Sequence, residues 1–462
     1  MDDFLNIAPY IFYLVASVLF IIGIKKLGSP KTARQGNQYS AVGMLIAIIV
    51  TLIDQRIVTF EWIIIGMIIG SVIGATIAIK VEMTAMPQMV GLLNGFGGGA
   101  SALVAFSEYF HSAGSNDVQT SITVVLSILI GAITFSGSLI AFGKLQGIVT
   151  GRSVKFPMQN LINVLLILFV IALGVIAVAD PDSAFVYELI VVIALLMGVL
   201  LVMPIGGADM PVVISLLNSY SGIAASMTGF VLGNNILIIT GALVGASGII
   251  LTDIMCKGMN RSLMNVLLGG WSNVAVSADD LEAKEVTIKA VDVEEAAMLF
   301  DAASRVIIIP GYGMAVAQAQ HAVKELMNVL LSKGIDVKFA IHPVAGRMPG
   351  HMNVLLAEAD VPYDRLMALE DINDDFSNTD IALVIGANDV VNPAAKHNQS
   401  SPIYGMPILN ADLSKTVIIN KRSMAAGYAG IDNELFGYPN ALMYFGDAKD
   451  AMTKLTNELK NM

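Results

Sequence analysis

Long apolar runs fill the first 265 residues of this chain and constrain its fold more than any other feature. A helix of roughly 20 mostly apolar residues can cross the hydrocarbon core of a membrane. Runs of about this length predict nine transmembrane helices, at Ile7–Leu27, Tyr39–Ile53, Trp62–Ile79, Met86–Phe106, Ile122–Phe142, Leu161–Ala179, Phe185–Met203, Pro211–Leu232 and Asn235–Met255. The second run is the shortest. The first half is therefore expected to be a polytopic, all-α membrane domain.

Lysine and arginine are unevenly distributed over the loops that these helices would leave. Ten of them fall on one side of the membrane and only Arg56 falls on the other. Because positively charged loops stay in the cytoplasm, this split places the N-terminus outside and everything after the ninth helix inside. The N-terminal residues are acidic, and no small-residue cleavage pattern follows the first run. We therefore expect no signal or transit peptide.

The remainder of the chain has a different composition. Residues 1–265 hold 11 Lys and Arg against 12 Asp and Glu, whereas residues 266–462 hold 15 against 25. An acidic balance without a basic cluster argues against a nucleic-acid partner, and the single Cys256 excludes an intrachain disulfide. We expect a transmembrane domain over 1–265, a charged linker over 266–290 and a soluble domain over 291–462.

Polar side chains inside or just before the apolar runs are candidates for a proton path, because placing them at membrane depth is costly. The candidates are Asn94, Ser138, Asp209 and Asn218. Each also has an ordinary structural interpretation. Asp209 lies just before a proline at a predicted helix start, where Asp is a favourable N-cap, and a single Asn or Ser is commonly satisfied by a neighbouring helix.

A strand–turn–helix–strand pattern opens the second half. A buried strand, Arg305–Pro310, leads directly into Gly311-Tyr312-Gly313, a helix of about 20 residues that ends near Lys333, and a strand at Val337–Ile341. Glycines in this context permit a tight turn and a close approach of the backbone to a pyrophosphate at the helix N-terminus. Val316 takes the place of the third glycine, so helix and strand should pack less closely. The pattern predicts an α/β, Rossmann-like dinucleotide-binding domain.

The strand ends of this domain favour NADP(H) over NAD(H). The second strand ends in His342-Pro343, without the acidic residue that binds the ribose hydroxyl of NAD. Lys421-Arg422-Ser423 follows the strand Thr416–Asn420 and offers two cations and a hydroxyl to a phosphate. A solvated surface loop is the plain alternative. The loops Gly386–Asp389 and Gly446–Ala448 also follow strands, and ligands bind at that edge of a doubly wound sheet.

Several segments closely resemble the beta subunit family of the proton-translocating NAD(P) transhydrogenases. In the soluble half they are Pro310–Ala319, His342–Asn353, Ile385–Asp389 and Lys421–Tyr428. In the membrane half they are Phe135–Lys144, Gly206–Pro211 and Leu217–Gly222. The resemblance covers nearly the whole chain. It implies an NADP(H)-binding domain attached to a proton-conducting helix bundle, with NAD(H) bound by a partner alpha subunit.

The resemblance also implies roles for individual residues. Asp389 would be the catalytic group that senses the coupled proton. Lys421, Arg422 and Ser423 would bind the 2′-phosphate, and Gly427 and Tyr428 would cover the cofactor. The other residues implied to contact NADP(H) are Gly311, Tyr312, Gly313, Val316, Val344, Ala345, Gly346, Arg347, Met348, Pro349, Gly350, Gly386, Ala387, Asn388, Gly405, Met406, Asp447 and Ala448. No metal site is expected.

One position departs from the family pattern. Some relatives carry a histidine in the fourth run that is thought to take up the proton, and this chain has Asn94 there. An asparagine can relay a hydrogen bond but cannot titrate near neutral pH. Our hypothesis is that a histidine or carboxylate on a helix of a partner subunit lies beside Asn94.

The implied activity is that of an Si/Re-specific, proton-translocating NAD(P)+ transhydrogenase. The chain has one dinucleotide motif and would act with its alpha subunit, as a dimer of alpha–beta units. It would be embedded in the lipid of a bacterial plasma membrane with its C-terminal domain in the cytoplasm. Two alternatives remain open at this point. One is a channel or transporter gated by a nucleotide-sensing domain, and the other is an NADPH reductase whose helices serve only as an anchor.

Overall fold

The computed structural model describes residues 2–54, 60–111, 117–151, 153–181, 183–206, 209–267, 288–399, 401, 403–424 and 431–462. Its internal contacts divide the chain into two units. The first comprises Met1–Ile205 and Val213–Leu251, and the second comprises Gly206–Val212 and Thr252–Met462. Most of the predicted linker, residues 268–287, lies outside the described residues.

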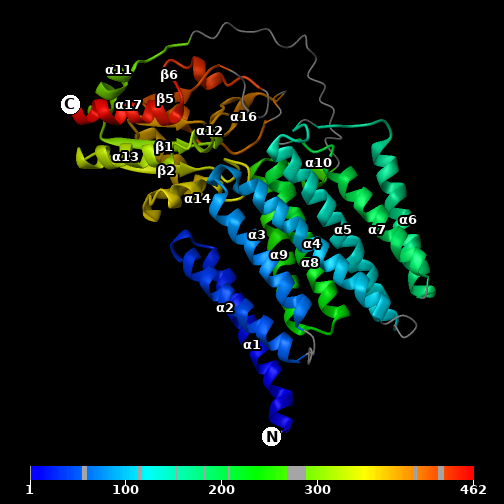
Figure 1. The fold of residues 1–462 in the computed structure, drawn as a ribbon. Helices are drawn as coiled ribbons and strands as arrows, with labels where there is room; N and C mark the ends of the chain where they lie inside the picture. The colour runs from blue at the N-terminus through cyan, green and yellow to red at the C-terminus, as the bar shows by residue number, and fades with distance from the viewer. Residues whose placement is uncertain are drawn as a thin grey trace. The chain divides into compact units, whose positions relative to one another are not determined.

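Nine helices among the described residues are long and apolar enough to cross a membrane (Figure 1). They are α1 (Asp2–Leu27), α2 (Pro30–Asp54), α3 (Glu61–Lys80), α4 (Met86–His111), α5 (Val118–Gln146), α6 (Gln159–Ala179), α7 (Ala184–Val202), α8 (Met210–Val231) and α9 (Asn235–Gly258). The nine predicted runs are thereby confirmed. The second helix begins earlier than its apolar run because Pro30, a favourable first helical residue, starts it in polar sequence.

Small residues hold α4 and α5 close together. A Cβ on Gly131 would lie 2.5 Å from the Gly98 carbonyl oxygen, so the two backbones touch there. Further along α4, the ring of Tyr109 stacks on the ring of Tyr187 from α7, with centroids 4.0 Å apart. In lipid, such close approach is a main source of helix–helix attraction, since no hydrophobic force drives helices together.

A six-stranded parallel sheet forms the centre of the second unit. Its strands are β1 (Arg305–Pro310), β2 (Asp336–Ile341), β3 (Leu366–Ala368), β4 (Ile381–Ile385), β5 (Thr416–Lys421) and β6 (Ala441–Phe445). The order β3-β2-β1-β4-β5-β6 is that of a doubly wound dinucleotide-binding sheet, which confirms the predicted fold class. The sequence pattern missed β3, whose three residues pair only with β2.

Helices cover both faces of this sheet. They are α11 (Val293–Asp301), α12 (Tyr312–Val316), α13 (Gln320–Ser332), α14 (His351–Glu358), α15 (Leu369–Ile372), α16 (Ala394–His397) and α17 (Ala448–Asn461); a short α10 (Leu263–Leu267) precedes residues 268–287. On one face α17 packs against α11, α13 and β5. On the other, alternate strand residues such as Ile307 and Val384 join a buried cluster with Ile372 and Phe376. Burial of strands on both faces explains their unbroken apolar sequences.

The helix predicted to follow the glycine turn is interrupted. The structure has the five-residue α12, a turn, and then the longer α13. Gln318 adopts a left-handed conformation with φ +49°, and the Ala319 N–H donates to the Met314 carbonyl at 3.0 Å. This turn allows both Ala315 and Ala319 to be fully buried. The prediction of one continuous helix was therefore wrong, because burial of two alanines outweighed helix continuity.

Candidate nucleotide-binding site and proton path

The turn from β1 into α12 lies directly against the turn that follows β4. The Gly311 N–H donates to the Ile385 carbonyl and the Gly313 N–H to the Gly386 carbonyl, each at 2.9 Å. Gly386 has φ +63°, and a Cβ on Gly311 would lie 2.4 Å from the Gly386 carbonyl oxygen. The two glycine segments thus form one backbone-to-backbone contact. It lies where the strand order reverses, which is where doubly wound sheets bind ligands.

His342 ends β2 as a buried part of the scaffold. Its Nδ1 accepts the Val344 N–H at 3.2 Å, so its proton sits on Nε2, which donates to the Pro407 carbonyl at 2.7 Å. Burial lowers the pKa of His342 to about 4, which keeps the imidazole neutral. The bond to Pro407 attaches the segment containing Gly405 and Met406 to the end of β2.

The loop between β2 and α14 folds back onto the start of α12. Its turns use Gly346 and Gly350, which have φ +110° and +68°. Between them, the Arg347 guanidinium lies 4.1 Å above the ring of Tyr312, and the Arg347 N–H donates to His351 Nδ1 at 3.1 Å. This placement combines a cation–π contact with a fixed loop backbone.

His351 is itself buried, and its second ring nitrogen is unsatisfied. Because Nδ1 accepts a hydrogen bond, the proton of the neutral ring lies on Nε2. Nε2 is buried and finds no hydrogen-bond partner among the described residues. Burial, together with the nearby charge of Arg347, lowers the pKa of His351 to about 4. A buried donor without an acceptor is costly unless a ligand supplies one.

Charged groups meet beyond the ends of β4 and β5. Asn388 Nδ2 donates to Asp389 Oδ1 at 3.2 Å. Lys421, at the end of β5, is half-buried with its Nζ 4.6 Å above the ring of Phe436. Burial lowers the pKa of Lys421 below its ordinary value, although the negative charges of Asp389 and Asp432 act in the opposite direction. A cation and a carboxylate from neighbouring strand ends therefore act on one another.

The predicted cofactor residues gather at the carboxyl ends of β1, β2, β4, β5 and β6, which form one edge of a parallel sheet. Val316 ends α12 and is 43% exposed, so its side chain does not fill the space between helix and sheet. Arg422 and Ser423 are exposed just after β5. Asp447 accepts the Lys449 N–H at 3.1 Å as the N-cap of α17, and Ala448 begins that helix. Gly427 and Tyr428 lie outside the described residues.

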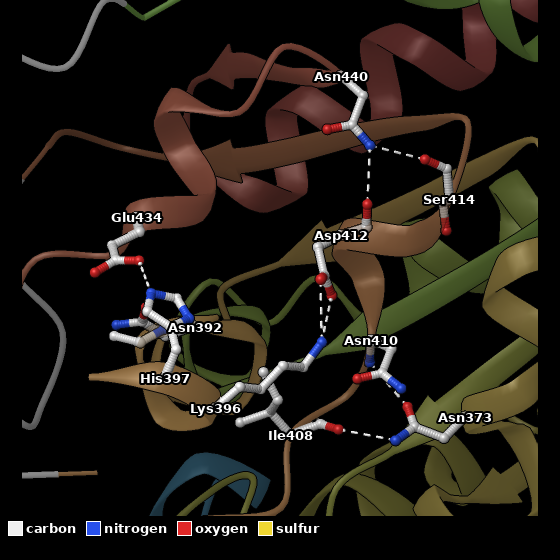
Figure 2. A network of polar contacts seen from close by, with 11 residues as sticks. Asn373, Asn392, Lys396, His397, Ile408, Asn410, Asp412, Ser414, Glu434 and Asn440 are labelled. Carbon is white, nitrogen blue, oxygen red and sulfur yellow. Dashed lines mark hydrogen bonds and ion pairs between the residues drawn. The ribbon is translucent and has the colours of Figure 1, made fainter. Parts of the chain in front are cut away.

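The segment that follows residues 425–430 is attached to the loop after β4. Asn433 Nδ2 donates to the Asn388 carbonyl at 2.9 Å, and Asn392 Nδ2 donates to the Asp432 carbonyl at 3.0 Å. His397, at the end of α16, contacts Glu434 at 2.8 Å (Figure 2). These contacts link the neighbourhood of Asp389 to the residues that precede β6.

A second set of polar contacts fixes the long segment between β4 and β5 (Figure 2). Lys396 pairs with Asp412 at 3.0 Å, and Asn440 donates to the carbonyls of Asp412 and Ser414 at 3.1 and 2.8 Å. Asn373 donates to the Ile408 carbonyl at 3.0 Å and its side-chain oxygen accepts the Asn410 N–H at 2.8 Å. The segment that carries Gly405 and Met406 is therefore held at both ends.

In the helix bundle, two of the predicted proton-path residues contact one another. Asn94 Nδ2, on α4, donates to Ser138 Oγ on α5 at 3.2 Å. The hydroxyl of Ser221, on α8, donates to the Asn94 carbonyl at 3.1 Å. Asn218 is exposed on α8. In the second unit, the Asp209 carboxylate forms an ion pair with Arg261 at 2.9 Å.

Comparison with known proteins places this chain in a family. The family model described as NAD(P) transhydrogenase beta subunit matches residues 10–458. The NAD(P) transhydrogenase subunit beta of Rhodospirillum rubrum is 53% identical over 455 residues, which are 97% of each chain, and the same protein from a second source of this species matches equally. The chain belongs to the NAD(P) transhydrogenase beta subunit family. It is a multi-pass membrane protein.

Sequence reasoning about this beta subunit family member missed several supporting residues. His351 and Asn433 hold the loops around the candidate site, yet neither stands in a glycine or basic motif. Their partners, Arg347 and Asn388, are predicted site residues. The sequence did contain a signal for His351, because it lies four residues after Arg347 in the segment His342–Asn353, which resembles the family. For Asn433 no local pattern existed.

Proposed function

We propose that this chain is the NADP(H)-binding, membrane-spanning subunit of a proton-translocating transhydrogenase. An alpha subunit would bind NAD(H) and present it to the chain, and hydride would pass between the two nucleotides while a proton crosses the membrane. The family assignment supports the activity. The choice of NADP(H) rests on the position of Lys421. It is a half-buried cation at the carboxyl-terminal edge of the sheet. The Gly311 turn and Arg347 follow strands that end at the same edge.

The residues present fit a phosphorylated dinucleotide. His351 Nε2 is a buried donor that needs an acceptor, and a phosphate oxygen is an acceptor of the right kind. His351 is the first residue of α14, directly after the loop whose Arg347 would supply positive charge to the pyrophosphate. Lys421, with Arg422 and Ser423, would bind the 2′-phosphate through charge-assisted hydrogen bonds. When bound, NADP(H) supplies the nicotinamide carbon that accepts or donates hydride.

Asp389 would couple the site to protons. Its carboxylate acts electrostatically on Lys421 and accepts a hydrogen bond from Asn388. Protonation of Asp389 would remove a negative charge that faces Lys421 and would turn an acceptor into a possible donor. Both changes would alter how firmly the β4 and β5 loops hold a phosphorylated ligand. The hydrogen bonds made by Asn433 and Asn392 link the loop after β4 to the residues before β6, so a movement of one would also move the other.

We further propose the assembly and setting implied by the family. These are a dimer of alpha–beta units in a bacterial plasma membrane, with the residues beyond 291 in the cytoplasm and residues 1–265 conducting the proton. Asn94 does not titrate, so a histidine or carboxylate on a helix of the alpha subunit would complete the path beside Asn94 and Ser138.

The test uses the full chain reconstituted in vesicles with an NAD(H)-binding alpha subunit. Reduction of an NAD+ analogue by NADPH is followed by absorbance, and proton movement by an internal pH dye. We expect hydride transfer that a proton gradient accelerates or slows. Ion flux that depends on nucleotide but occurs without hydride transfer would favour a gated channel. Hydride transfer indifferent to the gradient would favour an anchored reductase.

A further inference from the structure

The end of α9 contacts the loops of the candidate nucleotide site within the second unit. Asn260, two residues after the end of this helix, donates from Nδ2 to the Tyr404 carbonyl at 2.9 Å. Its amide lies directly over Gly405, where an added Cβ would collide with Asn260 Nδ2. Gly405 is one of the residues predicted to contact NADP(H). Asn260 therefore joins the end of a membrane-crossing helix to a turn of the candidate site.

The same end of α9 also meets the loop after β2. A Cβ on Gly258 would lie 3.6 Å from Pro343 Cβ and 3.8 Å from Val344 Cγ1, which is ordinary van der Waals contact. Val344 is also predicted to contact NADP(H). The His342 ring connects this loop to the segment that carries the turn, since its Nε2 donates to the Pro407 carbonyl. Two loops of the candidate site therefore meet the end of one helix.

The turn under Asn260 is attached on its other side to a buried cluster. Gly405 has φ +76°, and its N–H donates to the Ala395 carbonyl of α16 at 2.8 Å. The flanking residues Ile403 and Met406 are buried in one cluster with Ala395. Because closely packed side chains transmit a displacement, we expect the turn and this cluster to move together.

The Asn260 side chain projects from a well-fixed helix end. Asn260 has φ +49°, a left-handed conformation in which asparagine is common at the ends of helices. Its N–H donates to the Lys257 carbonyl at 3.0 Å, and the N–H of Arg261 donates to the Cys256 carbonyl at 2.9 Å. The Arg261 guanidinium is paired in turn with Asp209. A movement of the helix end would therefore carry the amide with it.

Capping of α9 is the competing explanation for Asn260, and it does not need the side-chain amide. A left-handed cap depends on the backbone conformation, which glycine adopts at least as readily as asparagine. The bond to Tyr404 is made by Nδ2, which takes no part in the backbone bonds of the cap. The two roles can therefore be separated by substitution.

We propose that Asn260 is a positioning residue that links the nucleotide site to the membrane-crossing helices. It holds the Tyr404–Gly405 turn against the end of α9, so that a displacement of either one is transmitted to the other. The proposal rests on the proposed proton-translocating function and names a specific link for it. Without this link, hydride transfer should respond less to a proton gradient.

The experiment compares two variants that tolerate the left-handed helix end and remove the donor. Asn260→Gly deletes the amide, and Asn260→Asp keeps its shape, but an ionised carboxylate can only accept. Each full-length chain is reconstituted with the alpha subunit in vesicles, and NADPH oxidation is measured with and without an imposed proton gradient. We expect the effect of the gradient to shrink roughly fivefold or more in both variants, as for other lost couplings between sites. Hydride transfer without a gradient should stay close to the wild-type rate.

Asn234→Gly is the matched control. Asn234 directly precedes α9, and its Oδ1 accepts the Leu237 N–H at 3.2 Å, so it caps the opposite end of the same helix. Its loss weakens α9 without removing the contact between Asn260 and Tyr404. The response to the gradient should remain that of the wild type.

A wild-type gradient response in either Asn260 variant would overturn the proposal. An equal loss of response in Asn234→Gly would also overturn it, since the effect would then come from the stability of α9. If one variant does not assemble, judged by gel filtration and thermal unfolding, the other decides, and failure of both would assign Asn260 to folding alone. A wild-type chain whose hydride transfer ignores the gradient would instead refute the proposed function.

Discussion

His342 shows how a residue at a strand end can be built into the scaffold of the sheet. It stands where an NAD-binding domain carries a ribose-binding carboxylate, and its ring is instead committed to Val344 and Pro407. The absence of a carboxylate at this position is visible in the sequence. It could not predict the bond to Pro407, which lies 65 residues further along the chain, because a local pattern holds no information on which distant loop will close over a strand end.

The buried state of His342 makes the sheet domain sensitive to acid. In the unfolded chain the ring titrates near 6.5, whereas burial lowers the pKa of His342 to about 4 in the fold. Between these values the unfolded chain binds a proton that the folded chain refuses, so unfolding becomes easier as pH falls. From pH 7 to 4 we expect a loss on the order of 3 kcal/mol from this group.

Hydrogen exchange of the β1 and β2 amides, corrected for the intrinsic rate at each pH, measures that loss. His342→Gln should weaken the fold at neutral pH and reduce the dependence on pH. An unchanged pH profile in the variant would show that other groups, such as His351, account for the acid sensitivity.

The preference for NADP+ over NAD+ can be tested by substituting the two basic residues at the end of β5. We expect Lys421→Ala with Arg422→Ala to weaken NADP+ binding by roughly 2–4 kcal/mol, because charge-assisted hydrogen bonds contribute about 1.5–3 kcal/mol each. NAD+ binding should barely change. Calorimetric titration of the purified chain with both nucleotides measures the difference, and Lys454→Ala, an exposed cation on α17, is the control. Equal losses for both nucleotides would contradict a 2′-phosphate site.

At the scale of elements, strand positions were predictable and helix continuity was not. β1 has the bounds read from its apolar sequence, and β4 and β6 end directly before the predicted loops at Gly386 and Gly446, since strands buried on both faces leave a continuous apolar signal. The break between α12 and α13 has no such signal. It depends on the burial of Ala315 and Ala319, and alanine is as compatible with a helix interior as with a buried turn.

The contact between the β1 and β4 turns carries the element-scale prediction. Gly311→Ala would push a methyl group into the backbone of Gly386 and Ala387, where the nearest atoms would be 2.4–2.5 Å away. Since backbone atoms cannot rotate aside, the two turns must separate. We expect NADP+ affinity to fall roughly tenfold or more, measured by the same titration. Gly97→Ala, whose Cβ would meet nothing within 4 Å, should bind normally.

At the scale of the molecule, composition alone separated a membrane part from an α/β part, and the structure has both. The candidate site was predicted best where glycines and cations sit at strand ends, because the parallel topology brings those ends together. What stayed hidden were contacts between distant segments, such as Asn433 with Asn388 and Asp209 with Arg261. These depend on three-dimensional neighbours that no spacing reveals.

The role of the bundle is tested at Asn94. Asn94→Ala removes the donor that reaches Ser138 and should abolish most proton movement in vesicles that contain both subunits. Asn163→Ala, a half-buried amide on α6, should leave it intact. Proton movement at the wild-type rate in Asn94→Ala would show that this position lies off the path.

The close backbone contact at Gly311 and Gly386 also has a genetic consequence. Every substitution of a glycine codon that changes the amino acid installs at least a β-carbon, and both positions reject one on geometric grounds. No other amino acid at either position would keep the contact, so neither glycine can be replaced and later restored without an intermediate that has lost it. Wherever descendants of this gene retain the nucleotide site, we expect both codons to encode glycine, and their loss would mark copies that have abandoned it.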